Sequence, residues 1–364
     1  MANNRLIKLI CKLPPKWKRR LMLKIEGDDV WMHGGKPLGP AMSAAINTFV
    51  PEDLQKDNKY MKQLISDIKQ CYIRYDLLPA EYFYFDFADK NWEERDEYLT
   101  DAGEDEILVK KIGYDKYLKD LSDKYHFYEQ AKPFFHRGIM LFDEHTGLEF
   151  FREFCLKARH LFIKPLAGSE GDGSFVFEAL NIKAVYTLFE KLVATKKKWM
   201  VEERIKQSDE FAHWNASSVN TVRLPTFLGK GVFFVLAPIF RTGRAGKPID
   251  NTSAGGVFAL VDSHNGMICS HGYDITTRVY EKHPDSGVVF MNYQIPQWET
   301  LLQTAEQVHR TFPEHPYIAW DFAHTNQGWE LIEGNWGRFR GAQLAGKKGL
   351  KSQFMEYING TTTT

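Results

Sequence analysis

Residues 319–335 read Ala-Trp-Asp-Phe-Ala-His-Thr-Asn-Gln-Gly-Trp-Glu-Leu-Ile-Glu-Gly-Asn. Two apolar runs flank the turn-like segment 325–328, and this pattern predicts an antiparallel β-hairpin. If the loop is centred on Gln327, Asp321 and Glu333 lie opposite one another and their carboxylates share one face of the sheet. Asn335 points to the same side as Glu333, because side chains alternate along a strand. The segment therefore predicts a strand pair with two carboxylates and one amide on one face.

These three side chains have the chemistry of a magnesium site. Two neighbouring carboxylates repel each other unless a cation joins them. Mg²⁺ takes oxygen ligands, and in nucleotide-binding sites it also binds the phosphates. We therefore predict Asp321, Glu333 and Asn335 as metal ligands. The alternative is an exposed hairpin with ordinary polar residues.

A second polar segment has the composition of a phosphate-binding loop. The apolar run 162–165 reads Phe-Ile-Lys-Pro, and residues 168–174 read Gly-Ser-Glu-Gly-Asp-Gly-Ser. A lysine at a strand end and bare backbone N–H groups can together hold phosphate oxygens. The lysine precedes the glycines, so this is not a Walker loop. An ordinary glycine turn is the alternative.

A third segment, residues 199–205, is an apolar strand that runs into polar residues. Such a strand end can border a flat ligand such as adenine, or it can simply leave the sheet. The surrounding sequence alternates helical spacing with short β-branched or aromatic runs, which indicates α+β or α/β architecture. We expect helices at 52–75, 115–134, 147–159, near 181 and at 297–312, and strands at 139–142, 161–164, 174–178, 199–202, 218–227, 231–241, 255–262, 267–272, 316–323 and 328–333.

The order and spacing of these segments resembles the ATP-grasp superfamily over roughly residues 115–345. In that superfamily two lysines stand about forty residues apart, and here Lys124 stands 40 before Lys164. More narrowly, the phrases at 218–223, 250–256 and 332–335 resemble the sugar-transfer-associated ATP-grasp family, which occurs with exopolysaccharide or capsule genes and is also labelled hexapeptide-transferase-related. The resemblance implies two α+β subdomains that grip ATP, after a mostly helical, divergent N-terminal region.

The resemblance also implies roles for individual residues. Two lysines would hold phosphates, the glycine-rich loop would close over them, and a Glu-Glu strand end would meet adenine. Two Mg²⁺ ions would be bound, with Glu333 bridging them. For ATP, the implied residues are Lys124, Lys164, Gly168, Ser169, Gly171, Gly173, Glu202, Glu203, Arg204, Ile205 and Glu210, with Asp209 as the alternative to Glu210 at the ribose.

Arginines complete the implied site. Arg223, Arg338 and Lys164 would act on the transferring phosphoryl group or the acceptor; for Arg223 an ordinary salt bridge to a neighbouring carboxylate is the alternative. The acceptor would be bound by Arg241, Asn251, Gly255, Gly256 and Arg340.

ATP-grasp enzymes typically transfer the γ-phosphoryl group of ATP to a carboxylate, which an amine then attacks. The resemblance thus implies an ADP-forming carboxylate–amine ligase with two small-molecule acceptors, in the synthesis of cell-surface polysaccharide or a glycan–amino acid conjugate. Two alternatives stay open. One is a phosphotransferase acting on a hydroxyl, and the other is a catalytically silent scaffold in glycan assembly.

Composition limits the function classes. The chain has 364 residues, 43% hydrophobic and 26% charged, as expected of a folded globular protein. Forty-seven basic residues balance forty-seven acidic ones, which argues against a general nucleic-acid binder. Four cysteines without a CxxC pair are typical of reduced, cytosolic proteins. We expect an N-terminal region at 1–110, ATP-grasp subdomains at 111–205 and 206–350, and a tail at 351–364.

Charge is unevenly distributed along the first third. Residues 1–25 carry eight Lys/Arg and no acid, whereas residues 86–106 carry ten Asp/Glu against two basic residues. The two segments could pair with each other or recruit partners. The basic segment also contains Leu, Ile and Trp, so it is either a pair of short helices packed on the protein or a helix lying on an anionic membrane surface. We expect a cytoplasmic location, and a position at the inner face of the membrane if the basic segment lies on a membrane surface.

Overall fold

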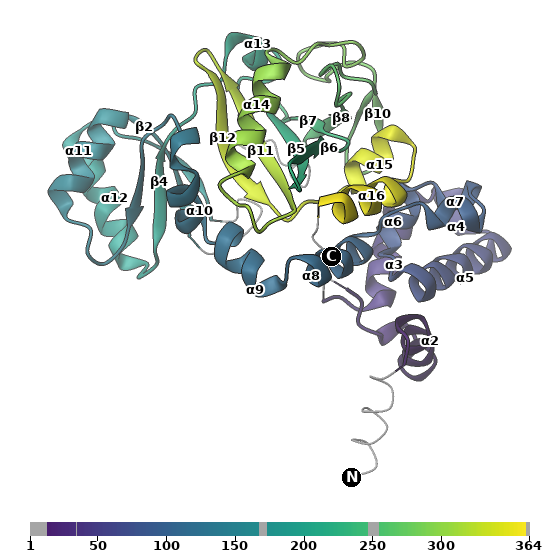
Figure 1. Cartoon of the computed structure of the whole chain (residues 1–364). Coiled ribbons are helices and arrows are strands. Elements are labelled where there is room, and N and C mark those ends of the chain that lie inside the picture. Colours follow the sequence, from purple (N-terminus) through teal and green to yellow (C-terminus); the bar gives the residue numbers. More distant parts are fainter. Residues whose placement is uncertain (1–12, 34, 167–172, 247–254, 362–364) are drawn as a thin grey trace. The chain divides into compact units, whose positions relative to one another are not determined.

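The computed structural model describes residues 13–33, 35–166, 173–246 and 255–361 (Figure 1). The chain divides into two compact units. Unit 1 comprises Met1–Lys111 and Arg338–Glu356, and unit 2 comprises Ile112–Gly337 and Tyr357–Thr364. The segment 338–350, which the sequence-based division places in the second subdomain, therefore packs in unit 1. Across the described stretches, no helix has both the length and the apolar character of a membrane span.

Unit 1 is helical. Its longest helix, α5, begins after Asp57, whose carboxylate accepts hydrogen bonds from two backbone N–H groups, and ends at Asp76 in the left-handed region. Aromatic side chains such as Phe85 and Tyr98, with ring centroids 4.9 Å apart, fill its core. The helices are α2 (Pro15–Glu26), α3 (Leu38–Phe49), α4 (Glu52–Gln55), α5 (Asn58–Tyr75), α6 (Pro79–Tyr84), α7 (Trp92–Asp96), α8 (Asp101–Lys111), α15 (Arg340–Gly346) and most of α16 (Lys351–Thr361), with 3-10 turns at Gly27–Asp29 and Phe87–Asp89.

Unit 2 begins with a series of short helical segments. The helix expected at 115–134 is divided, because Asp123 leaves the helical conformation and caps the next helix with its carboxylate. The pieces are α9 (Tyr114–Tyr117), a π-helical turn (Leu118–Ser122), α10 (Lys124–Ala131) and a 3-10 turn (Lys132–Phe134).

A small antiparallel sheet follows, in the order β1-β4-β2-β3. It is formed by β1 (Ile139–Phe142), β2 (His160–Pro165), β3 (Phe175–Glu178) and β4 (Trp199–Glu203), together with the helices α11 (Leu148–Ala158) and α12 (Ile182–Ala194). Both helices bury apolar side chains against the sheet in one core, as Phe151 and Leu188 do. These elements confirm the expected pattern to within about two residues.

The larger sheet of unit 2 has the order β10-β9-β8-β7-β5-β11-β12, and β6 also pairs with β5. Its strands are β5 (Thr221–Gly229), β6 (Val232–Val235), β7 (Ile239–Thr242), β8 (Val257–Leu260), β9 (Gly272–Tyr273), β10 (Val279–Tyr280), β11 (Tyr317–Thr325) and β12 (Gly328–Asn335). Helices α13 (Asp209–Ala212) and α14 (Trp298–His309) accompany it. Its core side chains include Trp320, Phe322 and Leu331.

Two strand predictions for this sheet were wrong in extent. The strand expected at 231–241 is divided, because Ala237 takes a positive φ of 47° and Pro238 has no N–H to donate. The strand expected at 267–272 is reduced to Gly272–Tyr273. There, Ile268 donates its N–H to Tyr293 in an irregular loop instead of to a neighbouring strand.

Candidate active site

The hairpin of β11 and β12 brings the three predicted metal ligands onto one face. Asp321 is opposite Glu333, as predicted, but by a different route. The turn pairs Thr325 with Gly328, which taken alone would place Asp321 opposite Ile332. A β-bulge next to Asp321 shifts the register by one residue.

The Asp321 carboxylate lies between two arginines. Arg223, opposite it on β5, donates from Nε to Oδ1 at 2.8 Å and from Nη2 to Oδ2 at 2.7 Å. The Nη2 of Arg241 lies 3.0 Å from Oδ2. Burial by itself would raise the pKa of Asp321, which is 2% exposed, but the two guanidinium groups hold that pKa below its usual range. The carboxylate is therefore ionised at neutral pH.

The residues present fit Mg²⁺. The Asn335 Nδ2 lies 3.1 Å from an oxygen of Asp321 and 3.2 Å from one of Glu333, so the three side chains meet at one point. Half a turn of the Asn335 amide group would present its oxygen to a cation in place of its nitrogen. Two carboxylates and an amide then form the all-oxygen set that a hard cation takes.

Lys164, at the end of β2, belongs to a buried chain of four charges. Its Nζ lies 2.5 Å from Oε1 of Glu202, and Arg137 donates to Oε2 of the same carboxylate at 2.6 and 2.9 Å. Arg137 also donates from Nη1 to Glu330 at 2.5 Å. Burial opposes ionisation of Glu202, but the two cations hold its pKa below the usual range. The chain Lys164–Glu202–Arg137–Glu330 thus links the two sheets of unit 2 with balanced charge.

Arg137 and Glu330 are the site residues that the sequence reasoning missed. Glu330 is three positions from Glu333, and simple alternation places the two on opposite faces. Glu330, opposite Ala323, lies on the face of Asp321, and the bulge beyond it brings Glu333 onto that same face. The available signal for Arg137 was its place just before the strand at 139.

Lys124, at the start of α10, shares these electrostatic surroundings. Its Nζ donates to the carbonyl of Leu166 at 3.2 Å. Burial lowers the pKa of Lys124, and the charge of Lys164 lowers it further, while Glu333 and Glu202 oppose the shift. A cavity of about 720 Å³ opens beside it, lined by Leu118, Ser122, Asp123, Pro165, Leu166, Lys197 and Lys198. Lys124 therefore interacts electrostatically both with Lys164 and with the predicted metal ligand Glu333.

A model of the protein family described as sugar-transfer associated ATP-grasp matches residues 117–359. The chain belongs to this family. It has the ATP-grasp fold with mixed α+β content, and its N-terminal region is helical within residues 15–134. No curated protein matches this ATP-grasp protein in sequence.

Solved ATP-grasp ligases are distant structural neighbours. D-alanine–D-alanine ligase from Bacillus anthracis is 13% identical with a TM-score of 0.40, over 66% of this chain and 67% of that one. The same enzyme in complex with ATP is 11% identical with a TM-score of 0.38, over 66% of this chain and 64% of that one. The ATP-grasp ligase PsnB in complex with a minimal precursor, Mg and ADP is 13% identical with a TM-score of 0.37, over 85% of this chain and 75% of that one. This ATP-grasp protein spans about two thirds of the length of the D-alanine–D-alanine ligases.

Other predicted ATP-site residues of this ATP-grasp protein have separate surroundings. Glu203 accepts from the N–H of Gly138 at 3.2 Å, and the N–H of Arg204 donates to His160. Glu210 and its alternative Asp209 are both exposed in the first turn of α13, so the geometry does not choose between them. Ile205 is partly buried, Gly173 has a positive φ of 74°, Gly255 is exposed and Gly256 is buried; Gly168, Ser169, Gly171 and Asn251 lie outside the described residues.

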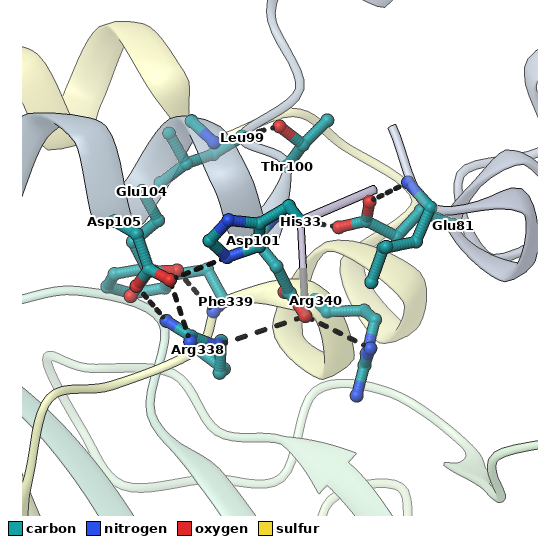
Figure 2. Close-up of polar contacts among 12 residues, drawn as sticks. His33, Glu81, Leu99, Thr100, Asp101, Glu104, Asp105, Arg338, Phe339 and Arg340 are labelled. Carbon is teal, nitrogen blue, oxygen red and sulfur yellow. Dashed lines mark hydrogen bonds and ion pairs between the residues drawn. The ribbon is translucent and has the colours of Figure 1, made fainter. Parts of the chain in front are cut away.

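Arg338 and Arg340 lie in unit 1, where their guanidinium groups face acids of α8 (Figure 2). Arg338 donates to both oxygens of Asp105 at 2.5 and 3.1 Å, and Arg340 donates to Asp101 at 3.1 Å. His33 contacts the same Asp105 at 2.8 Å. The catalytic role of Arg338 and the acceptor role of Arg340 stay predictions.

The described residues of the two charged segments pair with other parts of unit 1. Among the described residues, acids of the stretch 86–106 pair with the C-terminal segment 338–356. Asp101 pairs with Arg340, Asp105 with Arg338, and Asp86 with Lys347 at 2.8 Å. The described part of the basic stretch pairs elsewhere, since Arg19 lies 3.6 Å from Asp76. Several of these acids therefore hold the C-terminal segment in unit 1, while others, such as Asp96 with Arg74, pair within the N-terminal part.

Proposed function

We propose that the chain is an ATP-dependent carboxylate–amine ligase that forms an acylphosphate and releases ADP and phosphate. The observation that carries this proposal is the convergence of Asp321, Glu333 and Asn335 on one face, held by Arg223. Lys124 and Lys164 share that electrostatic environment. A phosphoryl transfer mainly requires positioning and neutralisation of charge, and this arrangement supplies both.

In the proposed reaction, an oxygen of the carboxylate substrate attacks the γ-phosphorus of ATP. The bond between that phosphorus and the β,γ-bridging oxygen breaks, and ADP leaves. The amine then attacks the acyl carbon, phosphate leaves, and the amine loses a proton as the amide forms. Lys124 and Lys164 would bind the phosphates of ATP.

Asp321, Glu333 and Asn335 would hold Mg²⁺, which when bound neutralises phosphate charge. Arg223 and Arg241 keep the Asp321 carboxylate ionised and oriented by their hydrogen bonds. Glu202 holds the Lys164 ammonium in place, and Arg137 fixes Glu202 in turn. The adenine would lie at the end of β4, beside the chain from Glu203 to Ile205.

The family's association with sugar transfer supports a glycan precursor or sugar acid as one acceptor. We place the reaction in the cytoplasm, where thiols stay reduced. The described cysteines, Cys71, Cys155 and Cys269, are all unpaired, which agrees with that compartment.

The test is a screen of carboxylate and amine pairs, read by release of ADP and phosphate. ADP release should require both acceptors and Mg²⁺, and Asp321→Asn should abolish it while Glu299→Gln, an exposed change on α14, should not. AMP release would contradict the proposal. A phosphorylated product without free phosphate would indicate a phosphotransferase, and failure to bind ATP–Mg²⁺ in calorimetry would indicate a scaffold.

A further inference from the structure

Helix α2 of unit 1 has two faces with different surroundings. One face is attached to the C-terminal end of α5 through Arg19, which donates from Nε to the carbonyl of Ile73 at 3.0 Å and from Nη2 to that of Arg74 at 3.3 Å. Met22 and Leu23, three and four positions from Arg19, are partly buried on this side. The hydrogen bonds of Arg19 fix which face of α2 is turned toward α5, and therefore which face is turned away from it.

The opposite face carries an apolar stripe. Trp17, Leu21 and Ile25 stand four residues apart and therefore share one side of the helix. Trp17 is 58% exposed and Ile25 is 57% exposed, and Leu21 between them is partly buried. Large side chains this exposed, aligned along one helix, mark a contact surface more than a scatter of single residues would.

Basic residues border this stripe. Lys18 and Lys24 lie on either side of it by helical geometry, and Arg20 stacks over the Trp17 ring with 5.7 Å between its Cζ and the ring centroid. All three are exposed. The one acid of the helix, Glu26, falls on the opposite side. Residues 1–12, outside the described part, add three more basic residues and no acid.

We propose that the Trp17–Leu21–Ile25 stripe of α2 docks on the surface of an anionic phospholipid bilayer. Exposed Trp and Ile side chains bury in the headgroup region, where the amphipathic indole ring is favoured. The flanking lysines and arginine then face negatively charged headgroups, and their long apolar stems follow the same surface. Arg19 and the rest of the inward face keep α2 attached to unit 1 during docking.

Charge complementarity selects this occupant. A protein partner or a second copy of this chain would need a compact patch of acids to match Lys18, Arg20 and Lys24. In the described part of unit 1, Asp86, Asp101 and Asp105 are paired with the C-terminal segment 338–356, and exposed acids such as Asp29, Glu52 and Glu93 stand on separate elements. A bilayer supplies anionic groups without specific shape, which suits a single short helix.

The test is co-sedimentation of the full chain with vesicles of phosphatidylcholine alone or mixed with phosphatidylglycerol. The mixed vesicles should bind the protein at least about tenfold more tightly. Replacing Lys18, Arg20 and Lys24 together by Gln should lower the partition coefficient about 100-fold. Trp17→Ala should lower it about tenfold, and added salt should weaken binding of the unmodified chain.

Matched controls come from the same unit. Replacing the exposed Lys56, Lys59 and Lys62 by Gln removes the same charge elsewhere, and Trp31→Ala removes a tryptophan that is 66% exposed outside the helix. Both should keep nearly full binding. Equal binding to the two vesicle types, no binding at all, or controls that fall as far as the α2 variants would overturn the proposal. So would a dimer in analytical ultracentrifugation that Trp17→Ala dissociates.

Discussion

Asp321 on β11 lies directly opposite Glu333 on β12 because a β-bulge shifts the hairpin by one residue. Without the bulge, Asp321 would be opposite Ile332 and the two carboxylates would not share a face. Glu330, opposite Ala323 on the turn side of the bulge, lies on that same face, where Arg137 binds it. One irregularity in the ladder thus brings the candidate metal ligands together on the face that carries Glu330 and its charge chain.

We expect Glu333→Gln to weaken ATP binding in the presence of Mg²⁺ by at least about tenfold, because a neutral amide binds a hard cation poorly. In the absence of divalent cations, the variant and the unmodified chain should bind nucleotide equally. Calorimetry with and without Mg²⁺ measures both. An equal loss under the two conditions would mean that Glu333 contacts the nucleotide itself.

Arg223→Met should destabilise unit 2 by roughly 3 kcal/mol, because it removes one partner of a buried ion pair. The change should also raise the pKa of Asp321, which burial favours and Arg223 opposes. Since a higher pKa means protonation at higher pH, Mg²⁺-dependent ATP binding of the variant should fail at a higher pH on acidification. Urea unfolding and calorimetry over a pH series would check both. An unchanged pH profile would contradict the role given to Arg223.

Arg137→Met should raise the KM for ATP more than it lowers kcat. Arg137 holds the Glu202 carboxylate in position, so without it Glu202 would shift and displace Lys164, its other partner. Adding Glu330→Gln to Arg137→Met should recover part of the lost stability, since the double variant buries one carboxylate fewer. A coupling of about 1–3 kcal/mol is expected in the double-mutant cycle. Arg310→Met, on the surface, is the control. Additive effects would show that Arg137 and Glu330 act separately.

Glu104 gives unit 1 a pH dependence. Burial raises its pKa to about 8, with Asp101 adding to the shift and Arg338 opposing it. The folded state therefore holds a proton that the unfolded state loses above about pH 4.5, so stability should fall as pH rises from about 5 to 8.

Glu104 should contribute a slope on the order of 1.4 kcal/mol per pH unit at most, and Glu104→Gln should remove that contribution while Glu81, whose pKa burial also raises to about 8, keeps its own. Hydrogen exchange of the α8 amides over this pH range measures the effect in unit 1. If Glu104→Gln and the unmodified chain show the same slope, Glu104 is ionised in the folded state.

Much of the site could be predicted from local pattern. The strand at 161–164, the hairpin and the side-chain alternation within it correctly placed Lys164, Asp321, Glu333 and Asn335. Residues adjacent in sequence share a strand, so periodicity of two determines that Glu333 and Asn335 lie on one face. That Asp321 shares this face depends on the bulge. The turn centre was wrong by half a residue, and the bulge compensated for it.

Pairings between distant strands could not be predicted. The partner of Arg223 is 98 residues away, and that of Arg137 in β12 is 193 residues away. Which of many carboxylates each arginine meets depends on strand order and register in the sheet, and the sequence states neither. The same holds for Arg338, whose place three residues after Asn335 suggested the active site but whose partners are on α8.

By itself, the sequence determined the alternation of helices and strands, the paired carboxylates and the family to which the chain belongs, because these depend on residues close together or on motif order. The tertiary structure alone decided which charges neutralise Asp321 and Glu202, where residues 338–356 pack, and which side of α2 remains exposed. Such contacts join segments far apart in the chain, and burial makes each unpaired charge costly, so packing of the folded chain selects the partners.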